Sequence, residues 1–206
     1  MSAATTGPRA ARGPGRPPSD APERISAAAL EVLKRDGYAG LTTAKVAAAS
    51  GQNKALISYY FGSKRGLVAA VARRVSQTIS DEVLSGLGSP RRAEELVDGL
   101  AAGVQRVFER DEGLQRVYFD LASQSVVDPD VGEILAEMKS EHRAILRELL
   151  RGLDRPPPAA DLDGIVVFLV AGLEGLSLER LERGETPALA GARRLFISGA
   201  TAAIGS

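Results

Sequence analysis

The chain has 206 residues, of which 44% are hydrophobic, enough for one or two domains with a buried core. It contains no Cys, so disulfides, thiolate metal sites and a cysteine nucleophile are excluded. The formal net charge is zero, but residues 1–75 hold twelve Lys and Arg against four Asp and Glu, a net charge of +8, and residues 76–206 carry −8. This division predicts a polyanion-binding N-terminal part joined to a body with another task, although two solvated surfaces with a chance bias would give the same composition.

No membrane or secretory segment is evident. The first residues contain no apolar stretch of the kind found in a secretory signal. The longest apolar run, Ile165 to Leu173, ends at Glu174 and is far shorter than the roughly 20 residues that span a bilayer. We therefore expect a soluble, cytoplasmic protein without membrane contact.

Residues 1–20 are rich in Ala, Gly, Pro and Arg and show no apolar periodicity, which predicts a disordered basic arm. Within this arm, the segment RGPGRPP (residues 12–18) sets Arg and Pro around Gly. A flexible basic arm can enter the DNA minor groove beside a recognition helix. It can equally serve only as a solubilising tail, and the sequence is compatible with both roles.

Four helices are predicted in the rest of the basic part, from apolar residues that recur at helical spacing. Their expected ranges are 22–37, 42–50, 53–60 and from 63 onward. Gly37 and Gly51 are expected to end the first two helices, and Asn53 and Ser63 to cap the third and fourth.

The second and third of these helices are short and are joined by a tight turn at Gly51-Gln52. Val46, Ala47 and Ile57 are expected to point inward and hold the two helices together, and Gly51 can take the left-handed backbone that the turn needs. This is the pattern of a helix-turn-helix, whose second helix enters the DNA major groove. By this geometry alone, an αα-hairpin without any DNA role fits as well.

A more specific signature lies within residues 24–71. In chain order it is Thr42-x-x-x-Val46-Ala47, Gly51, then Leu56-Ile57-x-Tyr59-x-Phe61-x-x-Lys64-x-x-Leu67. In these residues the chain resembles the N-terminal domain of the tetracycline-repressor (TetR) family of transcription regulators. The resemblance implies DNA binding through a helix-turn-helix at about residues 42–61. Two positions depart from the family's usual pattern, Gln52 in place of an aliphatic residue and Ser58 in place of Tyr, which changes the expected contacts and not the fold.

Ten residues are candidates for DNA contact. The start of the recognition helix is expected to read bases, because Asn and Gln can bond adenine and Lys can reach guanine. The base-reading candidates are Gln52, Asn53, Lys54 and Ala55. The phosphate-contacting candidates, which position the protein, are Thr43, Lys45, Ser58, Tyr59, Tyr60 and Lys64. Phe61 is instead expected to turn inward and close the three-helix core against Leu30, Leu33 and Leu67.

Five more helices are predicted after Gly88, at about 90–109, 112–125, 129–152, 161–183 and 187–204. No run of alternating apolar and polar residues bounded by turns indicates a strand. The sequence therefore predicts an all-α fold of about nine helices. Its expected parts are the disordered arm (1–20), a DNA-binding domain (21–75) and a second helical domain (76–206).

The resemblance also implies what the second domain does. In the TetR family the last two helices pair with those of a second copy in a four-helix bundle, so the expected homodimer uses helices 161–183 and 187–204. The segment Ile165 to Leu178 is apolar nearly all round, and its small residues, among them Gly172 and Gly175, permit close helix approach. Such a helix needs cover on both sides. A partner subunit would supply that cover, and so would an intramolecular core.

In the same family a cavity among the middle helices takes a small molecule. Ligand pockets are mostly apolar with a few placed polar groups, which points to the bulky or polar-tipped residues of the middle helices. These candidates are Phe108, Tyr118, Phe119, Met138, His142, Phe168 and Glu174. Glu174 interrupts an apolar stretch and could face a cationic ligand, whereas His142, the chain's only His, lies on the apolar face of its helix. For each of the seven, a place in the core or at an interface is the simpler interpretation.

Together these features predict a ligand-responsive repressor that binds a near-palindromic operator in double-stranded DNA as a homodimer and is released by a small-molecule effector. An activator or an effector-independent regulator would share the same features. A dimeric ligand-binding module without DNA is disfavoured by the basic first 75 residues. With one His, no Cys, no Gly-rich phosphate loop and no cluster with metal-ligand spacing, the sequence assigns no catalytic residue, metal or cofactor.

Overall fold

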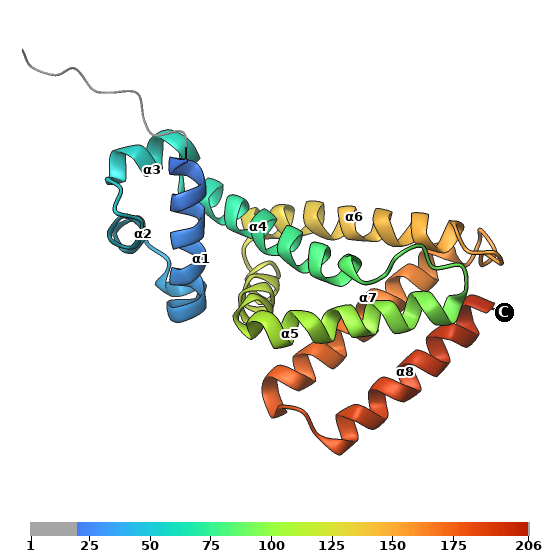
Figure 1. Cartoon of the computed structure of the whole chain (residues 1–206). Helices are drawn as coiled ribbons and strands as arrows, with labels where there is room; N and C mark the ends of the chain where they lie inside the picture. Colours follow the sequence, from blue (N-terminus) through green and yellow to red (C-terminus); the bar gives the residue numbers. More distant parts are fainter. Residues whose placement is uncertain (1–19, 206) are drawn as a thin grey trace, which may run out of the picture.

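The computed structural model describes residues 20–205, and these form eight helices without a strand (Figure 1). The helices are α1 (Ala21–Gly40), α2 (Thr43–Ser50), α3 (Lys54–Phe61), α4 (Lys64–Ser85), α5 (Ala93–Gln124), α6 (Pro129–Arg151), α7 (Leu162–Arg183) and α8 (Pro187–Gly205). The predicted all-α fold is confirmed. None of the helices in this range is long and apolar enough to cross a membrane. Nearly all of the expected basic arm lies outside the described residues.

The count is eight because the segments expected at 90–109 and 112–125 form one element, α5. Asp111 inside it departs from helical geometry, with φ −163° and ψ 87°, so the expected boundary is present as a break within the helix. The first helix behaves similarly. Gly37 takes a φ of 68°, which favours glycine, and a last turn to Gly40 follows it.

The helix-turn-helix is held by the residues that its pattern places inside. Val46 and Ile57 are buried, and Ala47 is partly buried against the same cluster. Phe61 also packs, partly buried, against this cluster, which contains Leu30, Leu33 and Leu67 as expected. The inward-facing residues of α2 and α3 are therefore confirmed.

Two clusters of buried side chains run through the molecule. The first joins α1 to α4 with the second half of α5 and the first half of α6. The second joins the remaining halves of α5 and α6 with α7 and α8. Between them, α4 runs without interruption across residue 75, where the boundary between the two domains was expected. One continuous helix therefore belongs to both ends of the molecule.

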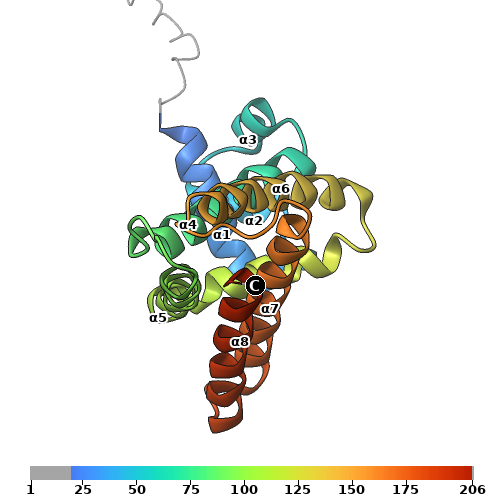
Figure 2. The same cartoon turned by 90° about the vertical axis from the view of Figure 1, so that its right-hand side faces the viewer.

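The last two helices, α7 and α8, lie side by side on the far side of the molecule from α3 (Figures 1 and 2). The Phe196 ring of α8 packs directly on Gly172 of α7, where an added Cβ would lie 2.1 Å from the ring. In the single chain this pair of helices also exposes the large apolar side chains of Val167, Phe168 and Leu195. Intramolecular packing thus covers only one side of α7.

Candidate DNA-binding surface and ligand cavity

The helix-turn-helix is shaped by short-range hydrogen bonds. The Thr42 side chain accepts a hydrogen bond from the Lys45 N–H at 3.2 Å and caps α2, and Gly51, with a φ of 66°, makes the turn. The Asn53 Oδ1 accepts from the Leu56 N–H at 2.7 Å and caps α3. Such caps satisfy backbone donors that the first helical turn leaves unpaired. Both helix starts are therefore fixed by residues three positions away.

The ten candidate DNA contacts gather on α2, α3 and the start of α4. Seven are exposed: Lys45, Asn53, Lys54, Ala55, Ser58, Tyr59 and Lys64. Thr43, Gln52 and Tyr60 are half-buried. Tyr59 is 74% exposed, whereas Tyr60 packs partly against the core and meets the Tyr59 ring edge-on at 5.1 Å. The two neighbouring tyrosines therefore have different surroundings.

The base-reading candidates differ in how far they are already engaged. The Asn53 oxygen is used in capping, so a pairwise contact with adenine would have to share it. The side chain of Lys54, the first residue of α3, forms no hydrogen bond or ion pair with any residue between 20 and 205. The Lys54 ammonium at the start of the recognition helix is therefore unengaged, and the Gln52 side-chain amide likewise forms no hydrogen bond with a described residue.

Two phosphate-contacting candidates are positioned by the end of α1. The Lys45 ammonium lies 2.9 Å from Asp36, and hydrogen bonds from Arg35 and then Lys45 hold the pKa of Asp36 well below its usual range. The Lys64 ammonium lies 4.3 Å from the centre of the Tyr38 ring and donates to the Tyr38 carbonyl at 3.4 Å. Both lysines are exposed. A phosphate at Lys45 would compete with Asp36 for the ammonium.

The same end of α1 is anchored to the acidic body, which the sequence did not indicate. The Tyr38 N–H donates to Asp120 at 2.5 Å, and its hydroxyl donates to Asp128 at 3.0 Å. The Lys34 ammonium pairs with Asp111 at 2.6 Å. These carboxylates stand at the break in α5, in its last turns and at the cap of α6.

A further contact of this kind links α4 to α6. The Arg65 guanidinium pairs with Asp130 and lies 2.5 Å from Glu133. Lys34 and Arg65 of the N-terminal end therefore form ion pairs with acidic residues of α5 and α6 and are not free to bind a polyanion. The sequence does show acidic residues at helix starts and breaks, but it does not show their partners, which are more than 60 positions away.

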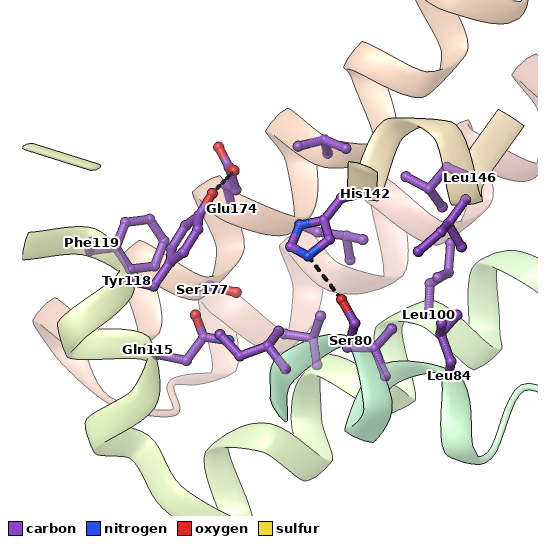
Figure 3. A pocket seen from close by; sticks show the side chains of 16 residues that line it. Ser80, Leu84, Leu100, Gln115, Tyr118, Phe119, His142, Leu146, Glu174 and Ser177 are labelled. Atoms are coloured by element: carbon purple, nitrogen blue, oxygen red, sulfur yellow. Dashed lines mark hydrogen bonds between the residues drawn. The ribbon is translucent and has the colours of Figure 1, made fainter. Parts of the chain in front are cut away.

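A cavity of about 140 Å³ lies among α4, α5, α6 and α7. Four of the seven candidate pocket residues line it: Tyr118, Phe119, His142 and Glu174. Figure 3 shows Tyr118, Gln115 and Ser177 toward one side, with His142 and Ser80 across from them. The cavity therefore collects side chains from distant parts of the chain, between Ile79 and Ser177.

The other three candidates lie elsewhere, which corrects their expected placement. Met138 is buried in the first core cluster, one turn before His142 on α6. Phe168 lies on the outer face of α7 against Phe196, because the cavity takes positions 170, 173, 174 and 177 and position 168 falls on the opposite side of the helix. Phe108 lies 4.3 Å from the Arg180 guanidinium and lines a separate small pocket.

The polar groups around the cavity are largely bonded to one another. The Tyr118 hydroxyl donates to Glu174, and Lys139 lies 3.2 Å from the same carboxylate oxygen. Burial, followed by the Glu174 contact, raises the pKa of Tyr118, which therefore remains a hydrogen-bond donor. His142 Nε2 lies 2.8 Å from both Ser76 and Ser80 hydroxyls. Burial lowers the pKa of His142, so its ring is neutral at pH 7.

Two cavity residues were missed from the sequence. Gln115 and Ser177 are each 5% exposed, line the cavity and form no side-chain hydrogen bond with any other described residue. A polar residue in mid-helix usually indicates a solvated face. The helical repeat could have identified them, because Gln115 is three positions from Tyr118 and Ser177 is three positions from Glu174, and such residues share a helix face.

Known proteins resemble both ends of the chain. Residues 25–71 match the family model for bacterial regulatory proteins of the tetR family, and residues 92–203 match that for the C-terminal part of BetI-type transcriptional repressors. The HTH-type transcriptional regulator CymR of Pseudomonas putida is 26% identical over 184 residues, which cover 84% of this chain and 89% of that protein.

Solved structures share the fold. A TetR-family transcriptional regulator from Rhodococcus sp. has a TM-score of 0.77 at 18% identity and covers 90% of this chain and 99% of its own. A transcriptional regulator from Saccharomonospora viridis in complex with choline has a TM-score of 0.68 at 20% identity and covers 88% of this chain and 95% of its own. At these identities the structures show a common architecture and nothing about the ligand of this chain.

Proposed function

Because this chain belongs to the TetR family of DNA-binding transcriptional regulators, with a BetI-type C-terminal domain, we propose that it is a ligand-responsive repressor. In this proposal it binds a near-palindromic operator as a homodimer. A small molecule that fills the cavity releases it from the DNA.

The position of α4 carries the proposal. Near its start, Leu67 and Val71 are buried in the core that holds the recognition helix. Near its end, Ile79, Ser80 and Val83 line the cavity. A ligand that prefers a different shape of the cavity therefore acts on one end of the helix whose other end supports the DNA-binding surface.

The open face of α7 and α8 supports the homodimer. Leu195 on α8 is 76% exposed, and Val167 and Phe168 on α7 are exposed as well. An apolar face of this kind on the last two helices is suited to a second copy of the chain. Two copies related by a two-fold axis would bring two recognition helices to half-sites of opposite orientation, which makes the operator near-palindromic.

The oligomeric state can be tested by analytical ultracentrifugation. The wild-type chain should sediment as a dimer at micromolar concentration. Leu195→Glu places a charge in the proposed interface and should produce monomers, whereas Arg155→Glu, in the loop before α7, should leave the dimer intact. A monomeric wild-type protein would contradict the homodimer.

The regulatory function can be tested by gel shift and footprinting with the DNA upstream of the protein's own gene. The expected footprint contains two inverted half-sites separated by whole helical turns. The ligand screen should include choline, the ligand in the Saccharomonospora viridis complex, beside uncharged and anionic compounds. DNA affinity that stays constant across a broad ligand screen would refute the ligand switch while leaving DNA binding in place.

A further inference from the structure

The charges around the cavity compensate one another. Among the described residues that line the cavity, Glu174 alone carries a formal charge, since His142 is neutral at pH 7. Its carboxylate accepts the Tyr118 hydroxyl and pairs with Lys139, whose ammonium lies 3.2 Å from one oxygen and 3.4 Å from the other. Lys139 is not itself a lining residue. The Glu174 carboxylate, which lines the cavity, is thus neutralised by a lysine outside the lining.

The remaining lining is mostly apolar, with two polar groups that lack partners. Gln115 and Ser177 are nine-tenths buried, and their polar ends face the cavity (Figure 3). Neither forms a side-chain hydrogen bond with another residue in the described part of the chain. Buried polar groups are nearly always hydrogen-bonded, so these two offer an amide and a hydroxyl to whatever occupies the cavity.

We infer that the cavity takes an uncharged, largely apolar molecule whose carbonyl, amide or hydroxyl group meets Gln115 and Ser177, and that Lys139 sets this preference by neutralising Glu174. The inference rests on the proposed function, because it names the chemical class of effector for the same cavity.

Charged ligands are disfavoured by the same geometry. A cation seeking Glu174 would have to displace the Lys139 ammonium or lie beside it, and like charges in a partly buried site repel strongly. An anion would meet the Glu174 carboxylate, and no described lining residue is positively charged; Arg143, whose charge reaches Tyr118, lies outside the lining. A neutral ligand disturbs neither the ion pair nor the Tyr118 hydrogen bond.

The experiment is isothermal titration calorimetry of the full chain with one skeleton in three charge states, together with choline. The probes are 1-naphthamide, 1-naphthylmethylammonium and 1-naphthoate. The amide should bind at least about tenfold more tightly than either charged naphthalene, and Gln115→Leu should weaken it by roughly tenfold, the equivalent of one hydrogen bond. Gln77→Leu, at an exposed position of α4 that does not line the cavity, is the matched control and should leave amide binding unchanged.

Lys139 provides the sharper test. Lys139→Met leaves Glu174 uncompensated, so affinity for the ammonium probe should rise at least about tenfold while that for the amide changes little. Lys139→Arg keeps the charge and should retain the wild-type preference. Lys139→Gln removes the same charge in a polar side chain and replaces the Met variant if thermal melting shows that variant to be unfolded.

Three results would overturn the inference. These are tighter binding of choline or the ammonium probe than of the amide by the wild type, an unchanged charge preference in both Lys139 neutral variants, or no binding of the amide. Gel shift with the operator separates these from failure of the proposed function. A protein that leaves DNA in response to a cation keeps the proposed function and loses the inferred ligand class.

Discussion

The DNA-binding surface and the cavity are built in opposite ways. The candidate DNA contacts fall within residues 43–64, on helices whose starts are capped by side chains three positions away. The cavity is assembled from α4, α5, α6 and α7, with lining residues from 79 to 177. Local sequence therefore sets the helix boundaries of the first site, whereas the second exists only once four helices have packed.

The two sites also differ in what their charged groups do. Lys54 at the start of the recognition helix is not paired with any described residue, as suits a surface that must meet a polyanion. At the cavity, the Glu174 carboxylate accepts a hydrogen bond from Tyr118 and forms an ion pair with Lys139. A substitution on the DNA-binding surface should therefore change binding alone, while one under either site should also change stability.

The largest expected effect comes from the core beneath the DNA-binding surface. Ile57 is 1% exposed, and Ile57→Ala should lower the free energy of unfolding by about 2–5 kcal/mol. The neighbouring Ser58→Ala, on the exposed face of the same helix, should change it by less than about 0.5 kcal/mol. Urea denaturation measures both, and equal stability of the two variants would show that α3 is not held by its buried face.

The next effect separates the two sites. Lys54→Ala should weaken operator binding by about 1–3 kcal/mol, because it removes the unengaged base-reading ammonium. Calorimetric binding of 1-naphthamide and the unfolding midpoint should stay as in the wild type. Arg155→Ala removes an equal charge far from the DNA-binding surface and should leave operator affinity unchanged in fluorescence anisotropy. Equal losses from both variants would reduce the role of Lys54 to net charge.

A smaller effect concerns the connection between the two ends. Tyr38→Phe deletes the hydroxyl that donates to Asp128 and should lower the free energy of unfolding by about 0.5–1.5 kcal/mol. We expect a reduced ratio of operator affinities without and with effector, since α1 is then held less firmly to the start of α6. Tyr59→Phe, with its exposed hydroxyl, is the control for stability. An unchanged ratio would assign the coupling to α4 alone.

The smallest effect is a pH dependence of stability that comes from Glu95 in the first turn of α5. Hydrogen bonds from the Arg91 N–H, the Arg92 side chain and the Arg92 N–H lower the pKa of Glu95 to about 2. Since this value lies below that of an unfolded Glu, about 4.3, the stabilisation is present above pH 4.3 and is lost as the pH falls toward 2. Glu95→Gln should flatten that part of the stability curve in thermal melts between pH 5 and 2. A variant curve parallel to the wild type would show that the exposed carboxylate contributes nothing.

Features that depend on neighbours in the chain were predicted from the sequence, whereas features that depend on distant contacts were not. The break at Asp111 was visible as a boundary, but whether α5 continues beyond it is set by packing against its neighbours. Asn53 was predicted both to cap α3 and to read bases, and the structure shows the cap. Phe168 was expected in the pocket for its size, while Gln115 and Ser177 were not among the predicted pocket residues.

The sequence by itself determined the all-α fold, the helix-turn-helix and the family, because helix periodicity, caps and the signature of residues 42–67 are properties of near neighbours in the chain. Only the tertiary structure decided which faces of α5, α6 and α7 meet at the cavity, and that Lys139 compensates Glu174 35 positions away. Those contacts depend on how helices cross and rotate against one another. That outcome depends on the sum of many weak packing interactions, and no single short stretch of sequence records it.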